Sequence, residues 1–578
     1  MRVRLAETAG FCMGVRRAMG RVLDAASKPG GRLVTYGPLI HNSQVTQLLE
    51  DRGVAVVRSP EEILAGDRVA IRAHGVAPGT REAIREKGAA ILDATCPHVA
   101  RAQGLVKRSA LSGRDVIIVG DRGHAEVVGL LGFARGRGHV VERVEDVDLL
   151  PPLGPVAVVA QTTQSEELFR AVERRVWERF PDCESHATIC GSTSDRQREV
   201  LQLVREVDVM IVVGGRHSAN TVRLAEIVRE AGKPVFHVEG AEELREEDFR
   251  QHSTAGVTAG ASTPNWVIEE VIARLESFHT ARTLPVVRSA LDLFQILVRS
   301  GVIVAVGAAG LAFAAAEMLG RDVRLRHLAI AFAYVVSMLN WNVSAEVRSG
   351  EMGDRTRAAL FRRYGHLFTA LSLAFAAAAA VLSASLGLAA LCVLLVSAVA
   401  GLFYTVPLFS RRLLGRYRRL KDLPGSRNIF FAGAVAVVTV VLPLLDRGSA
   451  APPLAGVWIP VVFVAVLAFS RSVALDLKDL QSDIFAGRDT IPVVLGDRGT
   501  KVLLGALLSF AAVSVVAGAA LGWIQARSAA QLLALGAVSG FFFLYHLRRI
   551  GFGVVFRALL DLTFLVPAAA AGLGRLLL

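Results

Sequence analysis

Three cysteines in short turn-forming segments are the residues of this sequence best suited to redox chemistry. Cys12 lies in AGFCMGV, Cys96 in DATCPHV and Cys190 in ATICGSTSDRQ, each at a predicted strand end or directly before a predicted helix. A single such cysteine could equally be a small buried hydrophobic residue. Four-iron clusters normally take four cysteines, so three thiolates would leave one iron with an open position. Together they indicate an iron–sulfur site that acts on a substrate.

Histidines and hydroxyl-bearing turns add groups that can bind an anion. His41 lies in LIHNSQV, His74 in IRAHGV and His124 in GHAEVVG. The segments HSAN (217–220) and TAGASTP (258–264) add hydroxyl and amide groups. Such side chains can converge on a phosphate group, although a lone histidine or serine turn is often only structural. Beside an open iron, an anion pocket suits the reductive removal of a hydroxyl group.

The elements that must position these residues are visible over residues 1–285. Short β-branched runs, such as 116–120, 156–160 and 209–214, alternate with amphipathic helical stretches. This pattern is typical of parallel sheets, whose ligands bind at the carboxyl ends of the strands. We therefore predict an α/β fold that gathers the cysteines, histidines and hydroxyl groups at strand ends.

Composition and charge limit the possible classes of protein. The chain has 578 residues and is 52% hydrophobic, yet it carries a net charge of +13. The arginines cluster beside long apolar runs, which indicates membrane topology and not nucleic-acid binding. The five cysteines include no CxxC pair, so a disulfide framework is not expected. Because the N-terminus has no apolar core of signal-peptide length, we expect the first half to stay in the cytoplasm.

The N-terminal motifs closely resemble those of the LytB or IspH family over roughly residues 1–280. The resemblance implies 4-hydroxy-3-methylbut-2-enyl diphosphate reductase activity in the methylerythritol phosphate pathway of isoprenoid synthesis. It implies three small α/β units around a central cavity, each supplying one cysteine to a [4Fe–4S] cluster. The allylic diphosphate would be reduced to isopentenyl and dimethylallyl diphosphate with loss of water. The electrons would come from a ferredoxin- or flavodoxin-like donor.

The resemblance also assigns roles to individual residues. The implied cluster ligands are Cys12, Cys96 and Cys190. The implied diphosphate ligands are His41, His74, His124, Ser218, Asn220 and Ser262. Glu126 would deliver protons, and Thr163, favoured over Thr162, would bind the hydroxyl end of the substrate. Two positions depart from the family pattern, since Ala219 replaces a second serine and Ala125 replaces a proline.

From about residue 290 onward, apolar runs of nearly 20 residues recur, each long enough to cross a bilayer. We predict about nine spans, at 297–319, 327–346, 366–386, 389–409, 428–445, 455–475, 502–524, 529–547 and 555–574. The connections after the second and fourth spans are rich in arginine, so the positive-inside rule predicts that they face the cytoplasm. The protein would then be a multi-pass protein of the cell membrane in contact with lipid. The first connection, with Arg321, Arg324 and Arg326, is an exception.

The sixth span runs into ALDLKDLQSDIFAGRDTIP, which carries three aspartates. Asp476, Asp479 and Asp483 are three and four residues apart, so they share one helical face. Carboxylates at the end of a membrane helix are costly unless they have a function. They can form a Mg²⁺ site for the diphosphate of a prenyl donor, or they can be a solvated helix end.

Residues 290–578 resemble the UbiA-type prenyltransferases in this aspartate motif and in the number of spans. The resemblance implies an all-α bundle of about nine helices that uses Mg²⁺. The first acidic motif of that family is reduced here. Asn340, which the resemblance implies as a further ligand of Mg²⁺ and the prenyl diphosphate, and Glu346 are present, but Ser344 stands where an aspartate is expected.

We therefore predict a reductase domain at 1–280, a linker at 281–295 and a prenyltransferase-like membrane domain at 296–578. The fusion would join two steps of isoprenoid metabolism. In a second interpretation, the C-terminal half is a non-catalytic membrane anchor or lipid-binding module. In a third, the N-terminal half is a cluster-based sensor without turnover.

Overall fold

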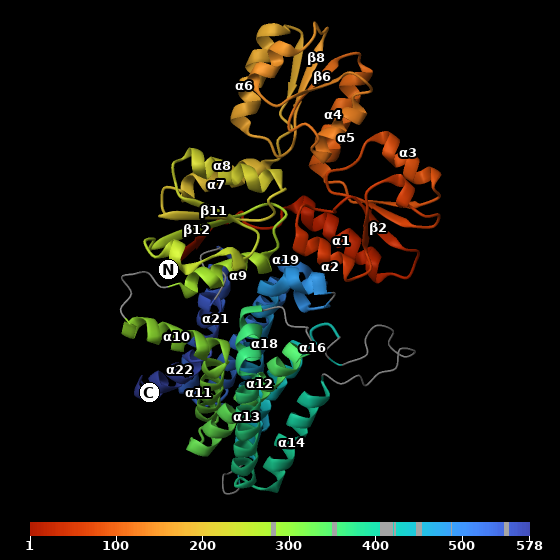
Figure 1. Ribbon diagram of the computed structural model, residues 1–578. Helices are drawn as coiled ribbons and strands as arrows, with labels where there is room; N and C mark the ends of the chain where they lie inside the picture. Colours follow the sequence, from red (N-terminus) through yellow and green to blue (C-terminus); the bar gives the residue numbers. More distant parts are fainter. Residues whose placement is uncertain are drawn as a thin grey trace. The chain divides into compact units, whose positions relative to one another are not determined.

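The structure is a computed structural model that describes residues 1–278, 285–348, 355–404, 420, 423–446, 454–486, 488–547 and 554–577. The chain divides into two compact units, Met1–Arg282 and Thr283–Leu578. Figure 1 shows the α/β unit in red to yellow-green and the helical unit in green to blue.

The first unit contains three four-stranded sheets in which every pairing is parallel, as the α/β prediction requires. Their strand orders are β1-β12-β10-β11, β3-β2-β4-β5 and β7-β6-β8-β9. The strands are β1 (Arg2–Leu5), β2 (Leu33–Tyr36), β3 (Ala55–Val57), β4 (Arg68–Ile71), β5 (Ala90–Asp93), β6 (Asp115–Val119), β7 (Gly138–Val141), β8 (Val156–Ala160), β9 (Cys183–His186), β10 (Val209–Val213), β11 (Val235–Val238) and β12 (Thr254–Ala259). The helices are α1 (Met13–Ser27), α2 (Ser43–Glu50), α3 (Pro78–Glu86), α4 (Pro97–Leu111), α5 (Ala125–Phe133), α6 (Glu166–Arg179), α7 (Gly191–Leu203), α8 (Ala219–Glu230) and α9 (Asn265–Ser277).

The first sheet joins the two ends of this unit. β1 pairs with β12 in parallel, from Arg2 opposite Thr254 to Leu5 opposite Val257. The segments that follow these two strands therefore emerge at the same edge, and Cys12 N donates to Ala261 O at 3.3 Å. Strands β8 and β10 are buried along their whole length, as near-continuous apolar runs predict for strands covered on both faces.

The second unit is entirely helical over the residues that the structure describes. Its α-helices are α10 (Pro285–Arg299), α11 (Val302–Met318), α12 (Leu325–Arg348), α13 (Arg355–Ala384), α14 (Leu388–Phe403), α16 (Ser426–Ala436), α17 (Leu442–Leu444), α18 (Leu454–Ala486), α19 (Ile491–Ala520), α20 (Leu532–His546), α21 (Val554–Leu562) and α22 (Val566–Leu577). A continuous apolar core runs through α11, α12, α16 and α18.

Seven helical segments among the described residues are long and apolar enough to cross a membrane. An eighth results if the bent pair Ser289–Arg299 and Val302–Met318 is taken as one span. The predicted span at 389–409 corresponds to a shorter apolar helix, Leu388–Gly401, and its end lies outside the described residues. The described residues thus support a multi-span bundle of seven to eight membrane-capable helices, against about nine predicted.

The arginines of the first connection have a structural partner, which explains the exception to the charge rule. Arg324 Nη1 lies 2.9 Å from Asp446 Oδ2, and Arg326 Nη2 lies 2.6 Å from Asp446 Oδ1. His327 Nε2 is 3.1 Å from the same carboxylate. The positive charge of this connection is therefore partly neutralised within the protein. Most of the arginine-rich connection after the fourth predicted span lies outside the described residues.

The segment predicted as a linker at 281–295 is mostly helical. Helix α10 begins at Pro285 and ends at Arg299, and residues 279–284 are outside the described part.

Candidate functional site

A single cavity of about 100 Å³ in the first unit gathers residues from all three sheets. It is lined by every predicted site residue of this half, namely Cys12, Cys96, Cys190, His41, His74, His124, Glu126, Thr163, Ser218, Asn220 and Ser262. These side chains come from turns at the carboxyl ends of parallel strands, where ligands of such sheets bind. The structure therefore brings together residues that are far apart in the sequence.

The three cysteines occupy equivalent positions at the start of helices. Cys12, Cys96 and Cys190 are the N-cap residues of α1, α4 and α7. The N–H groups of a first helical turn stabilise a thiolate or another anion. Burial raises the pKa of Cys96 and Cys190, while backbone N–H groups of the following turns oppose this effect. Buried thiols of this kind lose their protons readily only when a nearby cation or metal ion offsets the effect of burial on the pKa.

Gly14 keeps the space between two of these sulfur atoms free. A Cβ atom at this position would clash with Cys96 Sγ and would lie 3.8 Å from Cys12 Sγ. Any other residue at position 14 would therefore fill the space between the two thiol groups. Gly14 is not among the residues predicted from the sequence, although a glycine two residues after a candidate ligand indicates a close approach of other atoms.

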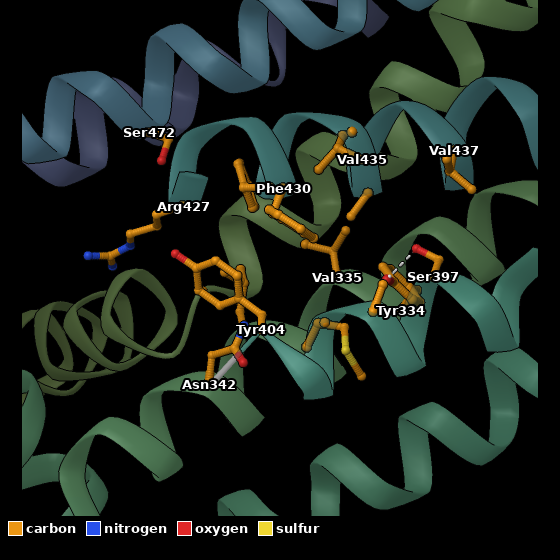
Figure 2. A pocket seen from close by; sticks show the side chains of 18 of the residues that line it. Tyr334, Val335, Asn342, Ser397, Tyr404, Arg427, Phe430, Val435, Val437 and Ser472 are labelled. Atoms are coloured by element: carbon orange, nitrogen blue, oxygen red, sulfur yellow. Dashed lines mark hydrogen bonds between the residues drawn. The ribbon is translucent and has the colours of Figure 1, made fainter. Parts of the chain in front are cut away.

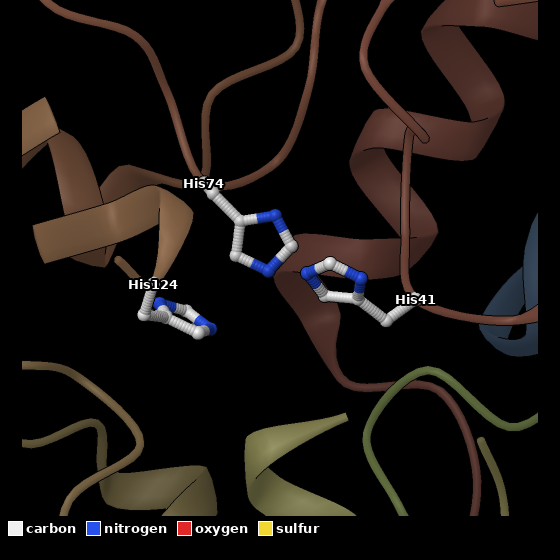
Figure 3. Close-up of side chains that lie close together, drawn as sticks. All are labelled: His41, His74 and His124. Carbon is white, nitrogen blue, oxygen red and sulfur yellow. The ribbon is translucent and has the colours of Figure 1, made fainter. Parts of the chain in front are cut away.

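The three histidines form a compact group at the cavity, as Figure 3 shows. The ring centroids of His41 and His74 are 4.7 Å apart, and those of His74 and His124 are 5.4 Å apart. Burial lowers the pKa of His41 to about 4 and lowers the pKa of His74 and His124 as well. All three rings are therefore neutral near pH 7, and each retains one N–H group to donate.

The hydrogen bonding of His124 determines which of its nitrogens can donate. His124 Nδ1 accepts from the backbone N of Glu126 at 3.2 Å. An accepting Nδ1 places the ring proton on Nε2, which becomes the donor. The Nδ1 atom of His74 is buried without a hydrogen-bond partner. Both observations indicate rings poised to bind a ligand in the cavity.

Glu126 is a buried carboxyl group, only 1% exposed. Its Oε1 accepts from Thr162 N at 2.7 Å, and its Oε2 accepts from Thr162 Oγ1 at 2.8 Å. Burial raises the pKa of Glu126 to about 7, against the stabilising effect of these two hydrogen bonds. Such a group can hold and release a proton near neutral pH.

Two adjacent threonines lie at this cavity, and they have different partners. Thr163 Oγ1 accepts from Gln161 Nε2 at 2.8 Å, whereas the Thr162 hydroxyl donates to Glu126. The predicted contact of Thr163 with a substrate hydroxyl is not tested by this geometry. The contact between Thr162 and Glu126 was missed, because a QTT turn alone does not show which threonine faces the neighbouring strand.

Hydroxyl and amide groups line the side of the cavity next to His41. Ser262 Oγ donates to His41 O at 3.2 Å and lies 3.5 Å from Ser218 Oγ. Both amide atoms of Asn220 are buried without a hydrogen-bond partner. Burying an unpaired amide is costly, so this side chain is arranged for a ligand. Ala219, where the family has a second serine, also lines the cavity and offers no hydroxyl group.

Arg196 is a further buried residue at this site that the sequence analysis missed. It is 2% exposed, and its guanidinium donates to Ala259 O and to Gly10 O. It therefore connects α7 to the end of β12 and to the segment that carries Cys12. An arginine in a polar helical stretch gives no sequence signal that distinguishes it from a solvent-exposed one.

The second unit contains a larger cavity of about 640 Å³ (Figure 2). Its walls come mainly from α12, α14, α16 and α18 and are largely apolar. The polar side chains Asn342, Tyr404 and Arg427 lie together toward one end in Figure 2. Away from them, Tyr334 and Ser397 are joined by a 2.8 Å hydrogen bond. The cavity thus combines a long apolar surface with a polar end.

The three predicted aspartates lie next to this polar end but do not line the cavity. Asp476 is buried and accepts from Asn428 Nδ2 at 2.8 Å. Asp479 Oδ1 lies 3.8 Å from Lys478 Nζ, and Asp483 Oδ1 lies 3.5 Å from Arg488 Nη1.

Arg427 links the aspartates to the cavity. It lines the cavity and lies close enough to Glu346, Asp476 and Asp483 to interact electrostatically with all three. The cavity wall itself is formed on α18 by residues one turn before Asp476 and Asp479, such as Ser472 and Leu475.

The structure brings Asn342, and not Asn340, to the cavity. Asn342 and Glu346 both line it, as expected for residues four apart on one helical face. Asn340 and Ser344 are also four apart, but they are buried away from the cavity, and Asn340 Oδ1 has no hydrogen-bond partner. The LNWN segment offers two asparagines on opposite sides of the helix, and sequence alone did not reveal which one faces inward. Four residues after Asn342 stands a carboxylate, Glu346. Four residues after Asn340 stands only the hydroxyl group of Ser344.

Comparison with known proteins matches the first unit to one family. The LytB protein family model matches residues 3–276. A relative from Solidesulfovibrio magneticus, named 4-hydroxy-3-methylbut-2-enyl diphosphate reductase, is 44% identical over 288 residues, which are 48% of this chain and 100% of the relative. A relative of the same name from Aquifex aeolicus is 42% identical over 47% of this chain and 95% of its own length.

Two solved structures each cover about half of this chain. The structure of an (E)-4-hydroxy-3-methyl-but-2-enyl diphosphate reductase is 41% identical and covers 48% of this chain and 99% of its own, with a TM-score of 0.39. A UbiA homolog from Aeropyrum pernix K1 is 18% identical and covers 47% of this chain and 96% of its own, with a TM-score of 0.38.

Proposed function

We infer the activity of the first unit from its family, because the chain belongs to the LytB protein family over residues 3–276. This unit is a 4-hydroxy-3-methylbut-2-enyl diphosphate reductase. It reduces the allylic alcohol of its substrate to isopentenyl and dimethylallyl diphosphate with the uptake of two electrons and two protons and the loss of water. The observation that carries this function is the convergence of three cysteines, three histidines and Glu126 on one cavity.

The residues present fit a [4Fe–4S] cluster. Cys12, Cys96 and Cys190 line one cavity at three helix N-termini, and Gly14 leaves room between two of their sulfur atoms. Thiolates are the ligands of such clusters. When bound, the cluster supplies the electrons of the reaction, which come from a ferredoxin- or flavodoxin-like donor.

The diphosphate of the substrate is bound by the polar side of the cavity. His41, His74 and His124 are neutral donors, and Ser218, Asn220 and Ser262 add hydroxyl and amide donors. Several converging donors suit the many oxygens of a diphosphate. The unpartnered amide of Asn220 supports this role, because a ligand would satisfy its buried atoms.

Glu126 supplies a proton to the reacting end of the substrate. Its pKa of about 7 keeps a useful fraction of the carboxyl group protonated near neutral pH. Thr162 holds the carboxyl in place through two hydrogen bonds, and Thr163 contacts the hydroxyl end of the substrate.

Growth of a bacterium depleted of its own reductase tests this function in cells. The full chain should restore growth, and Cys96→Ala should not. If the full chain accumulates with iron bound and growth still fails, the assignment is contradicted.

The second unit acts as a Mg²⁺-dependent prenyltransferase in the cell membrane, with residues 1–280 and the arginine-rich connections on the cytoplasmic side. An apolar cavity of about 640 Å³ is large enough for a prenyl chain. Asn342, Glu346 and Arg427 at its polar end are groups that suit a metal-bound diphosphate. Buried Asp476 and the unpartnered Oδ1 atom of Asn428 add oxygen ligands of the kind that Mg²⁺ prefers.

A specific observation favours the alternative of a non-catalytic anchor or lipid-binding module. Asp479 and Asp483 lie near cations of the protein, Lys478 and Arg488, which reduces their need for a metal ion.

Membranes that contain the chain should transfer a prenyl group from a prenyl diphosphate to a lipid-like acceptor when Mg²⁺ is present. The Asp476→Asn/Asp479→Asn variant should abolish this transfer, whereas no transfer by the unaltered chain would leave the anchor interpretation.

A further inference from the structure

Helix α10 (Pro285–Arg299) has two chemically distinct faces. Asp292, Gln295 and Arg299 are three and seven residues apart and therefore share one side of the helix. Most of the large apolar residues lie on the other sides of the helix, namely Val286, Val287, Leu291, Leu293, Phe294, Leu297 and Val298, whereas Ile296, which is 45% exposed, lies on the side of Asp292 and Arg299. This division is the pattern of a helix that lies at a boundary between an apolar and an aqueous medium.

Only the last turn of the apolar face is covered by the helical unit. Val298 is 1% exposed, and α10 packs there on α11 and α21. By contrast, Val286 is 80% exposed, Leu293 is 56% exposed and Leu291 is 48% exposed. A row of exposed large apolar side chains on one helix marks an interaction surface.

The connection to α11 indicates what this surface meets. Gly301, with φ of 78°, separates α10 from the apolar helix α11, and the two helices are bent by 64°. A positive φ is readily adopted only by glycine, so the bend is built into the sequence. Helix α11 enters the membrane, and the bend directs α10 away from the axis of α11. Helix α10 therefore lies nearer to the membrane plane than to the membrane normal.

We propose that α10 is an interfacial helix that inserts its apolar face into the headgroup region of the lipid bilayer, with Asp292, Gln295 and Arg299 toward water. The occupant of the exposed apolar face is lipid. The continuity of α10 with the membrane-spanning helix α11 places this face at the level of the bilayer surface. It is independent of the reductase and prenyltransferase activities.

Site-specific photo-crosslinking of the full chain in phosphatidylcholine–phosphatidylglycerol vesicles tests this proposal. Benzoylphenylalanine is placed at Leu291 or Phe294 on the apolar face, and at Asp292 or Gln295 as matched positions on the polar face. Peptides with a phospholipid adduct, measured by mass spectrometry, should be at least ~fivefold more abundant for the apolar positions. Equal yields on both faces, or adducts of Phe294 mainly with protein, from this chain or a second copy, would overturn the proposal.

Hydrogen exchange gives a second readout that does not depend on a crosslinker. In the same vesicles, Leu291→Ser/Phe294→Ser should speed the amide exchange of 289–299 by about tenfold, because the lost apolar contacts no longer hold the helix on the bilayer. Asp292→Ser/Gln295→Ser should leave this exchange unchanged. Exchange in α18 serves as the check that either variant is folded, and equal effects of the two double variants would count against lipid contact.

Discussion

The carboxyl group of Glu126 and the hydroxyl group of Thr162 are hydrogen bonded at 2.8 Å in a buried part of the reductase cavity. A second bond, from Thr162 N at 2.7 Å, holds the other carboxyl oxygen. Glu126 lies in the first turn of helix α5, which follows β6, and Thr162 follows the neighbouring strand β8. The sheet therefore positions the carboxyl group of Glu126, and burial raises the pKa of this group to about 7.

The pH dependence of turnover should report this carboxyl group. If Glu126 acts as the proposed acid, the protonated form is active, and kcat should fall as pH rises through about 7. The bonds from Thr162 stabilise the carboxylate and so lower its pKa. Thr162→Val should move the descending limb of the kcat profile to higher pH by about one pH unit.

Thr163→Val is the matched control for that experiment. Thr163 bonds Gln161 and not Glu126, so this variant should raise KM without moving the limb. If both threonine variants shift the limb equally, the assignment of Thr162 as the partner of the proton donor is wrong.

Replacement of a cavity histidine should weaken binding of the diphosphate. His41→Ala removes one neutral donor that faces the cavity, and KM should rise by roughly 10- to 100-fold while the iron content stays the same. His139→Ala, on β7 and 3.8 Å from Asp115, is a control away from the cavity. Steady-state kinetics that show the same KM for both variants would contradict a role of His41 in diphosphate binding.

Iron and sulfide content should distinguish the cysteines. Cys96→Ser should lose most of the bound iron under anaerobic purification, because one of three thiolates is missing. Cys183→Ser changes a cysteine that lies on β9 and does not line the cavity, so its iron content should equal that of the unaltered protein. Retention of a full cluster by Cys96→Ser would show that the cluster is held elsewhere.

The helical phase of α12 makes a prediction for prenyl transfer. Asn342→Ala and Glu346→Gln alter the cavity wall, and each should reduce transfer about 100-fold or more if these residues hold the metal-bound diphosphate. Asn340→Ala should have little effect, because Asn340 does not line the cavity. A radiolabelled prenyl diphosphate assay measures this difference, and a larger loss for Asn340→Ala would reverse the assignment.

Much of the reductase site could be predicted from sequence, because its residues lie in turns after strands. Parallel pairing brings such turns to common edges, so Cys12 and Ser262 line one cavity although they are distant in the chain. Choices between neighbouring residues could not be predicted in the same way. Thr162 and Thr163 point to opposite sides of one turn, so that Thr162 bonds Glu126 and Thr163 bonds Gln161. Which of them reaches Glu126 depends on how β8 pairs with the neighbouring strand β6.

Helical phase was the second obstacle to prediction. Asn340 and Asn342 each have a polar partner four residues later, so spacing alone fits both. The packing of α12 against its neighbours selects Asn342 for the cavity. Gly14 and Arg196 were missed for a related reason, because their importance arises from contacts with segments distant in the sequence.

Turnover by the anaerobically purified full chain tests the central claim most directly. Reduced protein is mixed with 4-hydroxy-3-methylbut-2-enyl diphosphate, and isopentenyl and dimethylallyl diphosphate are measured for the unaltered chain and for Glu126→Gln. The unaltered chain should form both products, and Glu126→Gln should be slower by about 10²- to 10⁴-fold with the same iron content. Absence of product from a protein with a full cluster, or equal rates for the two proteins, would contradict the account.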